Sequence, residues 1–206
     1  FEEQYGTRFD IVRNATVLQE LPERAPQGPY ILYQGAVNVG RGLEALIRAM
    51  PNIDCPLYIC GKGDIYDDLQ ALCRELGLTD KVTFWGYVEP EALRAYTLNA
   101  TIGITLFAGG GRSNQHSLAN RFFDYMHAGV PQLAMRYPEY TRFNQEFEVA
   151  RLVDDLTPEA ITEAVLELLN DPEYYGRLRQ QSLAARERYN WQEEEKTLLS
   201  VYARIP

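Results

Sequence analysis

Basic residues and cysteines are scarce in this sequence, and long hydrophobic runs are missing. Lysine and arginine together number 20 against 29 aspartates and glutamates, so the net charge is -9. Because binding to a nucleic-acid backbone needs a basic surface, we expect no general nucleic-acid partner. A small phosphate-bearing ligand is still compatible, since one or two basic side chains and helix amides can hold it. No segment of the sequence is long and apolar enough to span a bilayer.

The three cysteines, Cys55, Cys60 and Cys73, fit no zinc or redox spacing. We expect them to be buried free thiols. The sequence also lacks a catalytic triad, a metal-ligand cluster and a GxxxxGK[ST] loop, and no GxGxxG follows the first predicted strand. We therefore expect neither a metal nor a resident cofactor.

The chain has 206 residues, enough for one well-buried α/β domain, alone or with a fragment of another. Because it begins with Phe1, we expect it to be a piece of a longer protein. Residues 1–27 are predicted to be a lead-in from a preceding domain, with a short strand at 9–13 and a linker marked by Pro22 and Pro26. Residues 28–206 are predicted to form one domain.

Apolar strand patterns alternate with helical patterns through that domain. Strands are predicted at residues 30–34, 56–60, 81–85, 101–106, 130–134 and 150–153. Helices are predicted at residues 42–50, 64–76 (capped by Asp64), 89–99, 117–128, 140–147, 158–169, 172–189 and 192–204. The alternation indicates an α/β fold: a doubly wound, parallel, six-stranded Rossmann-like sheet with helices on both faces and extra C-terminal helices.

In the common strand order 3-2-1-4-5-6, the winding reverses between the first and fourth strands, and ligands bind there at the carboxyl ends. The loops after these strands, residues 35–42 and 107–116, are the two richest in glycine, the second through the run at 109–111. We therefore expect both loops to border one site.

The second loop leads into a helix with clear start and stop signals. Ser117 is the predicted N-cap, with Asn120 in the capping-box position, and Gly129 and Pro131 end the helix. Helical spacing places Leu118, Phe122, Tyr125 and Met126 on one side, and Asn120, Arg121 and Asp124 on another. A glycine-rich loop that leads into a helix N-terminus is typical of an anion site.

The polar groups at this edge suggest how a nucleotide could be held. Arg41 suits phosphate oxygens, because guanidinium donors are forked and permanently charged; alternatively, it is a surface arginine at a helix start. The amides of residues 118–120 could hold a phosphate. Asp124 could accept hydrogen bonds from two ribose hydroxyls, or it could form an i,i+3 ion pair with Arg121.

Other residues at the same edge are weaker candidates. The tight turn at Gly61 offers backbone groups, and Tyr87 and Val88 could border a flat base or simply pack in the core. His116 lies just before the helix, next to the expected phosphate. We expect His127, within the helix, to be a packing or surface residue.

Four segments resemble motifs of the C-terminal, donor-binding domain of GT-B glycosyltransferases of the retaining "group 1" type (family four). GAVNVGRG at 35–42 is similar to the family's Gly-Arg-x5-Lys-Gly loop, with Arg41 in the lysine position and Ala36 in the arginine position. LYICGKG at 57–63 and VTFWGYV at 82–88 resemble the family's second and third strand motifs. DYMHAGVP at 124–131 resembles its "E.maaG.P" signature.

The resemblance implies roles for individual residues. His116 and Asp124 occupy the two positions of the family's Glu-x7-Glu element, so His116 would contact the donor sugar and Asp124 the ribose. Arg41 would stabilise the diphosphate. The implied donor-binding residues also include Gly35, Gly42, Gly61, Tyr87, Val88, Ser117, Leu118, Ala119, Asn120 and Arg121. The segment 117–125, SLANRFFDY, is close to a motif of a subgroup that acts on surface polysaccharides.

On this resemblance we expect a fragment of a retaining glycosyltransferase that binds a UDP- or GDP-sugar for transfer to a polysaccharide or glycoconjugate. The family's fold implies an absent N-terminal acceptor domain, without which the fragment would be inactive. We expect a cytoplasmic protein, with peripheral association of the full-length enzyme at the inner face of the membrane. Two alternatives stay open: a sugar-nucleotide epimerase of the same fold, and a non-catalytic nucleotide-binding or scaffolding domain.

Overall fold

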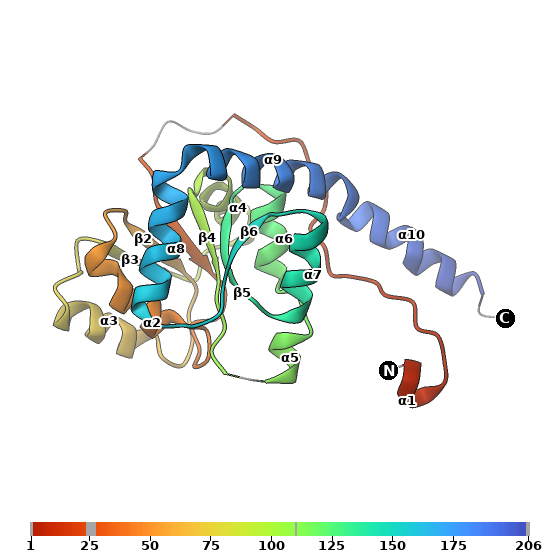
Figure 1. The fold of residues 1–206 in the computed structure, drawn as a ribbon, viewed down its shortest axis with the longest axis horizontal. Coiled ribbons are helices and arrows are strands. Elements are labelled where there is room, and N and C mark those ends of the chain that lie inside the picture. Colours follow the sequence, from red (N-terminus) through yellow and green to blue (C-terminus); the bar gives the residue numbers. More distant parts are fainter. Residues whose placement is uncertain (1, 24–27, 110, 205–206) are drawn as a thin grey trace.

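The computed structural model describes residues 2–23, 28–109 and 111–204. Six parallel strands form one sheet in the order β3-β2-β1-β4-β5-β6, which confirms the predicted doubly wound topology. Figure 1 shows the sheet in the middle of the domain, with helices packed around it. Gly110, in the predicted glycine run, and residues 24–27 of the predicted linker lie outside the described residues.

The strands are short, mostly apolar runs; β1, β4 and β5 in the middle of the sheet are buried at every position, whereas β2, β3 and β6 have partly exposed residues and Trp85 of β3 is exposed. They are β1 (Ile31–Gln34), β2 (Leu57–Cys60), β3 (Val82–Gly86), β4 (Ile102–Thr105), β5 (Gln132–Met135) and β6 (Ala150–Val153). In the middle of the sheet, Ile31 lies opposite Leu57 on one side and Ile102 on the other. The carboxyl ends of β1 and β4 are therefore neighbours.

Two groups of helices cover the sheet. The first contains α2 (Leu43–Ala49), α3 (Tyr66–Glu75) and α8 (Pro158–Asn170), and α2 packs against both of the others. In the second, α6 (Asn120–His127) packs against α4 (Pro90–Asn99) and α9 (Pro172–Arg188). A 3-10 turn, η1 (Met50–Asn52), follows α2, and α7 (Pro138–Glu146) contacts β6. This arrangement is what right-handed crossovers produce when the chain, after β3, crosses back and adds β4 beside β1.

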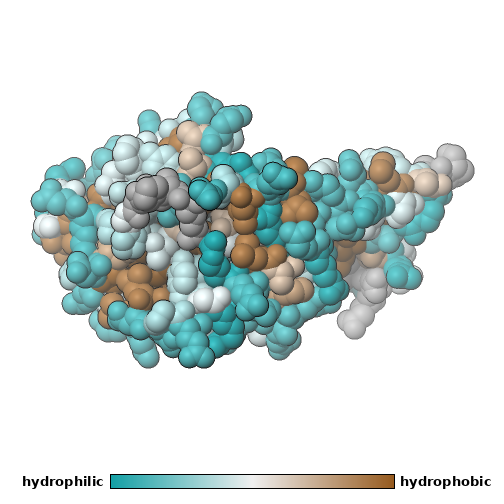
Figure 2. Space-filling model, turned by 90° about the horizontal axis from the view of Figure 1, so that it is seen from above, coloured by the Kyte–Doolittle hydropathy of each residue, from teal (hydrophilic) through white to brown (hydrophobic). Residues whose placement is uncertain are grey.

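The last helix, α10 (Trp191–Tyr202), projects away from the body of the domain near the N-terminal segment (Figure 1). Seen from above, this projecting part carries hydrophobic groups among hydrophilic ones (Figure 2). Leu199 and Tyr202 of α10 are exposed, as are Tyr5 and Ile11 of the lead-in. Within the part of the chain that the structure describes, no helix is both long and apolar enough to cross a membrane.

The lead-in differs from its prediction. Residues 9–13 form no strand; instead Arg13 and Asp10 form ion pairs with Glu194 and Arg204 at the two ends of α10. The segment runs beside α10 rather than beside an edge strand, so it has no neighbouring strand with which to form backbone hydrogen bonds. A short helix, α1 (Glu2–Tyr5), precedes it. The division of the chain at residue 28 stays a prediction, although Ala15 is buried in the core of the domain.

Two further details of the helices were predicted wrongly. Asp64 does not cap α3, because that helix starts later, at Tyr66, with Ile65 in the N-cap position and no side-chain cap. A short helix, α5 (Arg112–Gln115), was missed in the loop before α6.

The three cysteines agree with their prediction: all are free and buried. Burial raises the pKa of each thiol to about 11, which keeps the thiols protonated at neutral pH.

Candidate functional site

A cavity of about 440 Å³ lies at the carboxyl ends of β1 and β4, where the winding of the sheet reverses. Both predicted glycine-rich loops contribute to it, as expected from the strand order. Its walls are formed by Gln34, Gly35, Ala36, Arg41, Leu93, Phe107, Leu118, Ala119, Asn120, Arg121 and Asp124. Seven of the thirteen predicted site residues are thus gathered in one place.

The first loop, residues 35–42, has a fixed backbone. Tyr33 donates its hydroxyl hydrogen to the carbonyl of Ala36 (2.6 Å), and the amide of Val37 donates to the carbonyl of Lys62 (3.0 Å). Asn38 accepts a hydrogen bond from the amide of Asp64 (3.1 Å). The loop is therefore tied to the strand before it and to the neighbouring loop after β2.

Two predicted glycines act on the backbone rather than in the cavity. A Cβ at Gly61 would overlap the carbonyl of Gly35, so the glycine lets the loop after β2 approach the first loop. Gly42 has φ +70 at the N-cap of α2, and a Cβ there would lie 3.0 Å from Leu106. Neither residue lines the cavity, and both let other cavity residues take their positions.

Two arginines share the ring of Phe107. The guanidinium carbon of Arg41 lies 5.2 Å from the ring centroid, and that of Arg121 lies 4.8 Å from it. Arg121 also lies 4.9 Å from the ring of Tyr33 and donates to the carbonyl of Leu106 (3.4 Å). It is only 8% exposed, and its Nε is buried without a hydrogen-bond partner among the described residues. The cavity wall therefore holds two cations, one of them with an unused donor.

The position of α6 is set by its packing on the sheet. Tyr125 lies on Gly103 of β4, where a Cβ would overlap the tyrosine ring, and its hydroxyl donates to the carbonyl of Leu32 (2.9 Å). Phe122 makes edge-on contacts with the rings of Tyr140 and Phe143. With these residues buried, the helix turns Asp124 and the end of Arg121 toward the cavity.

The start of α6 differs from its prediction. The helix begins at Asn120 with Ala119 as N-cap, and Ser117 lies two residues too early to cap it. Ser117 instead donates to the carbonyl of Ser113 in α5 (2.6 Å). The amide of Ala119, one of the three predicted phosphate donors, already donates to the hydroxyl of Tyr140 (3.1 Å). The first-turn amides of Asn120 and Arg121 have no intrahelical acceptor, as at any helix start.

Asp124 is held from two sides. Its Oδ1 accepts a hydrogen bond from the hydroxyl of Thr16 (2.7 Å), and its Oδ2 accepts one from the side-chain Nε2 of Gln34 (3.0 Å). Burial raises the pKa of this carboxyl, while both hydrogen bonds oppose the rise. None of the ion pairs between described residues joins Asp124 to Arg121, so the i,i+3 alternative is wrong.

The remaining predicted residues do not line the cavity. His116 and Ser117 are exposed in the loop before α6. Tyr87 is also exposed, whereas Val88 packs against a small hydrophobic cluster on the α4 side of the sheet. His127 is a packing residue, as expected: it is buried, and its Nε2 contacts the carbonyl of Tyr189 (2.8 Å). Burial lowers the pKa of His127.

Four residues that matter at the site were missed from the sequence. Gln34 offered a signal, because a polar residue ends an otherwise apolar strand. Phe107 looked like an ordinary apolar residue after β4. Thr16 lies in the segment set aside as a lead-in, and Thr97 of α4, which donates to Gln34 (2.7 Å), is buried within a helix. Among the described residues, no group of three His, Cys, Asp or Glu side chains could hold a metal ion.

A sheet of this order, with a cavity that contains two arginines at its switch point, is typical of nucleotide-binding α/β domains. The model of the family "Glycosyl transferases group 1" matches residues 19–188, so the chain belongs to this family.

The chain is 25% identical over 206 residues to a phosphatidyl-myo-inositol mannosyltransferase of Mycobacterium leprae, covering 97% of the chain and 52% of that protein. Over 76 residues it is 40% identical to a glycosyltransferase of Methanocaldococcus jannaschii, covering 35% of the chain and 20% of that protein. The chain thus spans about half or less of these relatives.

Among solved structures, the fold is similar to that of S. aureus TarM, solved as a mutant with fondaparinux, α-GlcNAc-glycerol and UDP. The TM-score is 0.75 at 11% identity, over 97% of this chain and 41% of that one. The similarity supports the expected GT-B type of fold.

Proposed function

We propose that this chain binds the nucleoside diphosphate part of a nucleotide-sugar and is the donor-binding part of a glycosyltransferase. The observation that carries the proposal is the cavity at the switch point of the sheet. It combines two arginines, the start of α6 and a carboxylate held by two hydrogen bonds. These are the groups that a diphosphate and a ribose require.

Each group has a distinct task in this proposal. Arg41 and Arg121 neutralise the diphosphate, and the buried Nε of Arg121 gains the acceptor that it lacks. The first-turn amides of α6 and the positive end of its dipole add to this attraction. Asp124 accepts the ribose hydroxyls. During transfer, the same cations stabilise the negative charge that develops on the leaving diphosphate.

Family membership and the named relatives support transfer of a sugar as the activity of the whole enzyme. Because the chain spans about half of the mannosyltransferase, we propose that a further domain supplies the acceptor site. A UDP- or GDP-sugar donor, a retaining outcome, a polysaccharide or glycoconjugate acceptor, a cytoplasmic location and peripheral membrane association belong to this proposal. The contact of His116 with the donor sugar remains a prediction.

Titration calorimetry of the chain with UDP and GDP tests the binding step. We expect one of the two to bind, and we expect Asp124→Ala and Arg41→Ala each to weaken binding about tenfold or more, since each removes a charge-assisted contact. Arg48→Ala is the matched control, because Arg48 is exposed on α2 and does not line the cavity. Absence of binding by the wild-type chain to both nucleotides would disprove the proposal.

The two alternative functions give different results in the same experiments. A scaffolding domain would bind neither nucleotide, and a non-catalytic nucleotide-binding domain would bind one of them without sugar transfer by the whole protein. A sugar-nucleotide epimerase would convert a UDP-sugar to its epimer without an acceptor, which chromatography of the incubated nucleotide-sugar would detect.

A further inference from the structure

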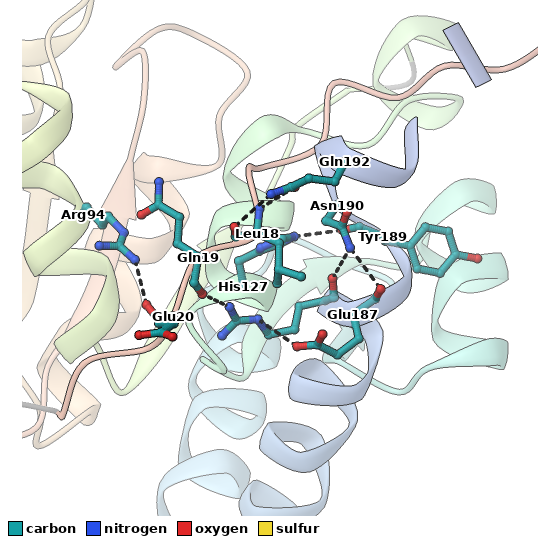
Figure 3. A network of polar contacts seen from close by, with 10 residues as sticks. Leu18, Gln19, Glu20, Arg94, His127, Glu187, Tyr189, Asn190 and Gln192 are labelled. Carbon is teal, nitrogen blue, oxygen red and sulfur yellow. Dashed lines mark hydrogen bonds and ion pairs between the residues drawn. The ribbon is translucent and has the colours of Figure 1, made fainter. Parts of the chain in front are cut away.

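A segment of the lead-in, residues 13–20, which we call the strap, crosses the domain beside α6 and α9. Figure 3 shows the polar contacts that hold it. The amide of Leu18 donates to the side chain of Gln192 (2.9 Å), whose own amide donates to the carbonyl of Leu18 (3.0 Å). The amide of Trp191 donates to the carbonyl of Thr16 (3.0 Å). The start of α10 therefore fixes the backbone of the strap at Thr16 and Leu18.

Further contacts fix the strap on either side of these residues. Arg186 of α9 donates to the carbonyl of Gln19, and Arg94 of α4 donates to the carbonyl of Glu20 (3.2 Å). At the other end, the backbone amide and the guanidinium of Arg13 both contact the buried carboxylate of Glu194 (2.9 and 3.1 Å). Five residues of the strap thus meet three helices in one network: Arg13, Thr16, Leu18, Gln19 and Glu20. Thr16 lies in the middle of this network.

Two side chains of the strap, Asn14 and Thr16, turn toward the proposed donor site. The hydroxyl of Thr16 donates to Oδ1 of Asp124 (2.7 Å), and the side-chain Nδ2 of Asn14 donates to Oδ1 of Asn120 (3.1 Å). Both partners lie on α6 and line the cavity. The contacts join residues 108 and 106 positions apart in the sequence.

The second oxygen of Asp124 is held in a comparable way. Gln34, at the end of β1, donates to Oδ2, and the buried hydroxyl of Thr97 donates to the side-chain oxygen of Gln34 (2.7 Å). This chain orients the amide of Gln34, so that its NH₂ group, and not its oxygen, faces the carboxylate. The carboxylate plane of Asp124 is therefore fixed by one donor from the strap and one from the sheet.

A carboxylate has two oxygens with about four lone-pair sites in all. Thr16 and Gln34 each occupy one site, on different oxygens, which leaves one site on each oxygen. Two neighbouring ribose hydroxyls need this arrangement: one acceptor oxygen for each hydroxyl. The two donors also stabilise the charged form of Asp124, the form that accepts both hydroxyls.

We propose that Thr16 is a positioning residue of the donor site, which orients the carboxylate of Asp124 for the two ribose hydroxyls. This inference rests on the proposed function. It assigns the strap, which precedes the sheet in sequence, a part in nucleotide recognition. Because the start of α10 fixes the backbone of Thr16, the position of that helix is linked to the geometry of the site.

Calorimetry with two matched ligands tests the inference: the nucleotide that the wild-type chain binds, UDP or GDP, and its 2′,3′-dideoxy analogue, which lacks both ribose hydroxyls. Thr16→Val removes the hydroxyl and keeps the shape of the side chain. We expect it to weaken binding of the ribonucleotide about tenfold, the loss typical of a hydrogen bond to a charged group. Binding of the dideoxy analogue should stay unchanged, because that ligand does not use Asp124.

Thr16→Ser keeps the donor and should bind both ligands like the wild type. Thr162→Val is the matched control, because Thr162 is a half-buried threonine on α8, hydrogen-bonded to the carbonyl of Ala49 and distant from the cavity. Thermal unfolding of each variant establishes that it is folded. If Thr16→Val does not fold, Thr16→Ala replaces it, since alanine brings no apolar branch next to the carboxylate.

The pH dependence of binding provides a second measurement. Asp124 lines two cavities, and each contains further charged or titratable side chains. The proposed donor cavity contains Arg41 and Arg121. A second cavity of about 340 Å³, under the strap, contains Arg94, His127 and Arg186. Loss of the Thr16 donor should move the acidic limb of ribonucleotide binding to higher pH, whereas Thr162→Val should leave it in place.

The outcomes separate the two proposals. If the wild-type chain binds neither UDP nor GDP, the proposed function fails and the inference fails with it. If the wild type binds and Thr16→Val binds the ribonucleotide equally well, only the inference is overturned. An equal loss for the ribonucleotide and the dideoxy analogue also overturns it, because the effect would then be a general structural one.

Discussion

Residues 35–42 and residues 107–119 border the same cavity, but their backbones are held by different kinds of contacts. The first loop is bonded to its own strand through Tyr33 and to the loop after β2 through the amides of Val37 and Asp64. It contains no helix and has little freedom to change shape. The backbone that carries Arg41 is therefore held in place by the fold itself.

The second loop is held mainly by tyrosine hydroxyls at the start of α7, together with a backbone bond from the amide of Ala108 to the carbonyl of Gly40 (2.9 Å). Tyr137 donates to the carbonyls of Phe107 and Gly109 (3.0 and 3.2 Å), and Tyr140 accepts from the amide of Ala119. Between these points, α5 has no buried residue. The comparison indicates that the first loop is tied along its length, whereas the described part of the second loop, which carries His116 outside the cavity, is tied mainly near its two ends.

The sharpest test of the comparison exchanges a glycine for alanine next to each loop. A Cβ at Gly63 would overlap Asn38 and the carbonyl of Val37 in the first loop, so Gly63→Ala must displace that loop. We expect a loss of about 3 kcal/mol or more in the free energy of unfolding, as for other overpacked sites. Denaturant unfolding measures it. Gly111→Ala in the second loop has φ -61 and only Asn114 within 4.0 Å, and should cost less than about 0.5 kcal/mol. Equal costs would contradict the comparison.

A pair of tyrosine variants tests how the backbones are held. Tyr137→Phe and Tyr33→Phe each remove hydrogen bonds from one loop, at about 1 kcal/mol each. We expect Tyr137→Phe to speed amide hydrogen exchange across residues 107–119, because few other contacts hold the described residues of that loop. Tyr33→Phe should leave exchange in residues 35–42 nearly unchanged, since the bonds of Val37 and Asn38 remain. Faster exchange in both loops would show that they are equally dependent on one residue.

The pH dependence of stability tests how the end of α6, the helix that follows the second loop, is packed against the rest of the domain. Burial lowers the pKa of His127 below its unfolded value, so the unfolded chain takes up a proton first. The contribution of this residue to stability is complete above about pH 6.5 and is lost as the pH falls through the lowered value. His127→Gln can keep a donor to the carbonyl of Tyr189 without titrating. Thermal unfolding at pH 7.5 and 5.5 should therefore show a smaller loss in this variant than in the wild type; an equal loss would mean that other groups govern it.

The smallest expected effect concerns the start of α6. Ser117 does not cap this helix, so Ser117→Ala should change the free energy of unfolding by less than about 0.5 kcal/mol. Asn190 does cap its helix, accepting from the amide of Glu193 (3.0 Å), and Asn190→Ala should cost about 1 kcal/mol or more. Denaturant unfolding of both variants measures the difference. A loss of 1 kcal/mol at Ser117 would restore the capping role that the sequence suggests.

The fold could be predicted because each strand is a short apolar run between turn signals, and alternation with helices leaves one common topology. The positions of Arg41, Arg121 and Asp124 followed from that topology, since all three lie near carboxyl ends of strands. The N-cap of α6 could not be predicted. Ser117 has a preferred N-cap side chain, but the helix that packs its apolar face on the sheet begins only at Asn120, with Ala119 as N-cap. Thr16 could not be found either, because its contact with Asp124 spans 108 positions and depends on how α10 is placed.

Gly103 and Tyr125 have a consequence for how this sequence can vary. The tyrosine ring fills the space that any side chain at position 103 would need, and its hydroxyl donates to the carbonyl of Leu32 in the neighbouring strand β1. A larger residue at 103 is compatible with this fold only if position 125 becomes smaller, and a smaller residue at 125 leaves a void above β4. We therefore expect positions 103 and 125 to be substituted together during evolution. Because position 125 directly follows Asp124, the packing of the sheet restricts which sequences can form the site.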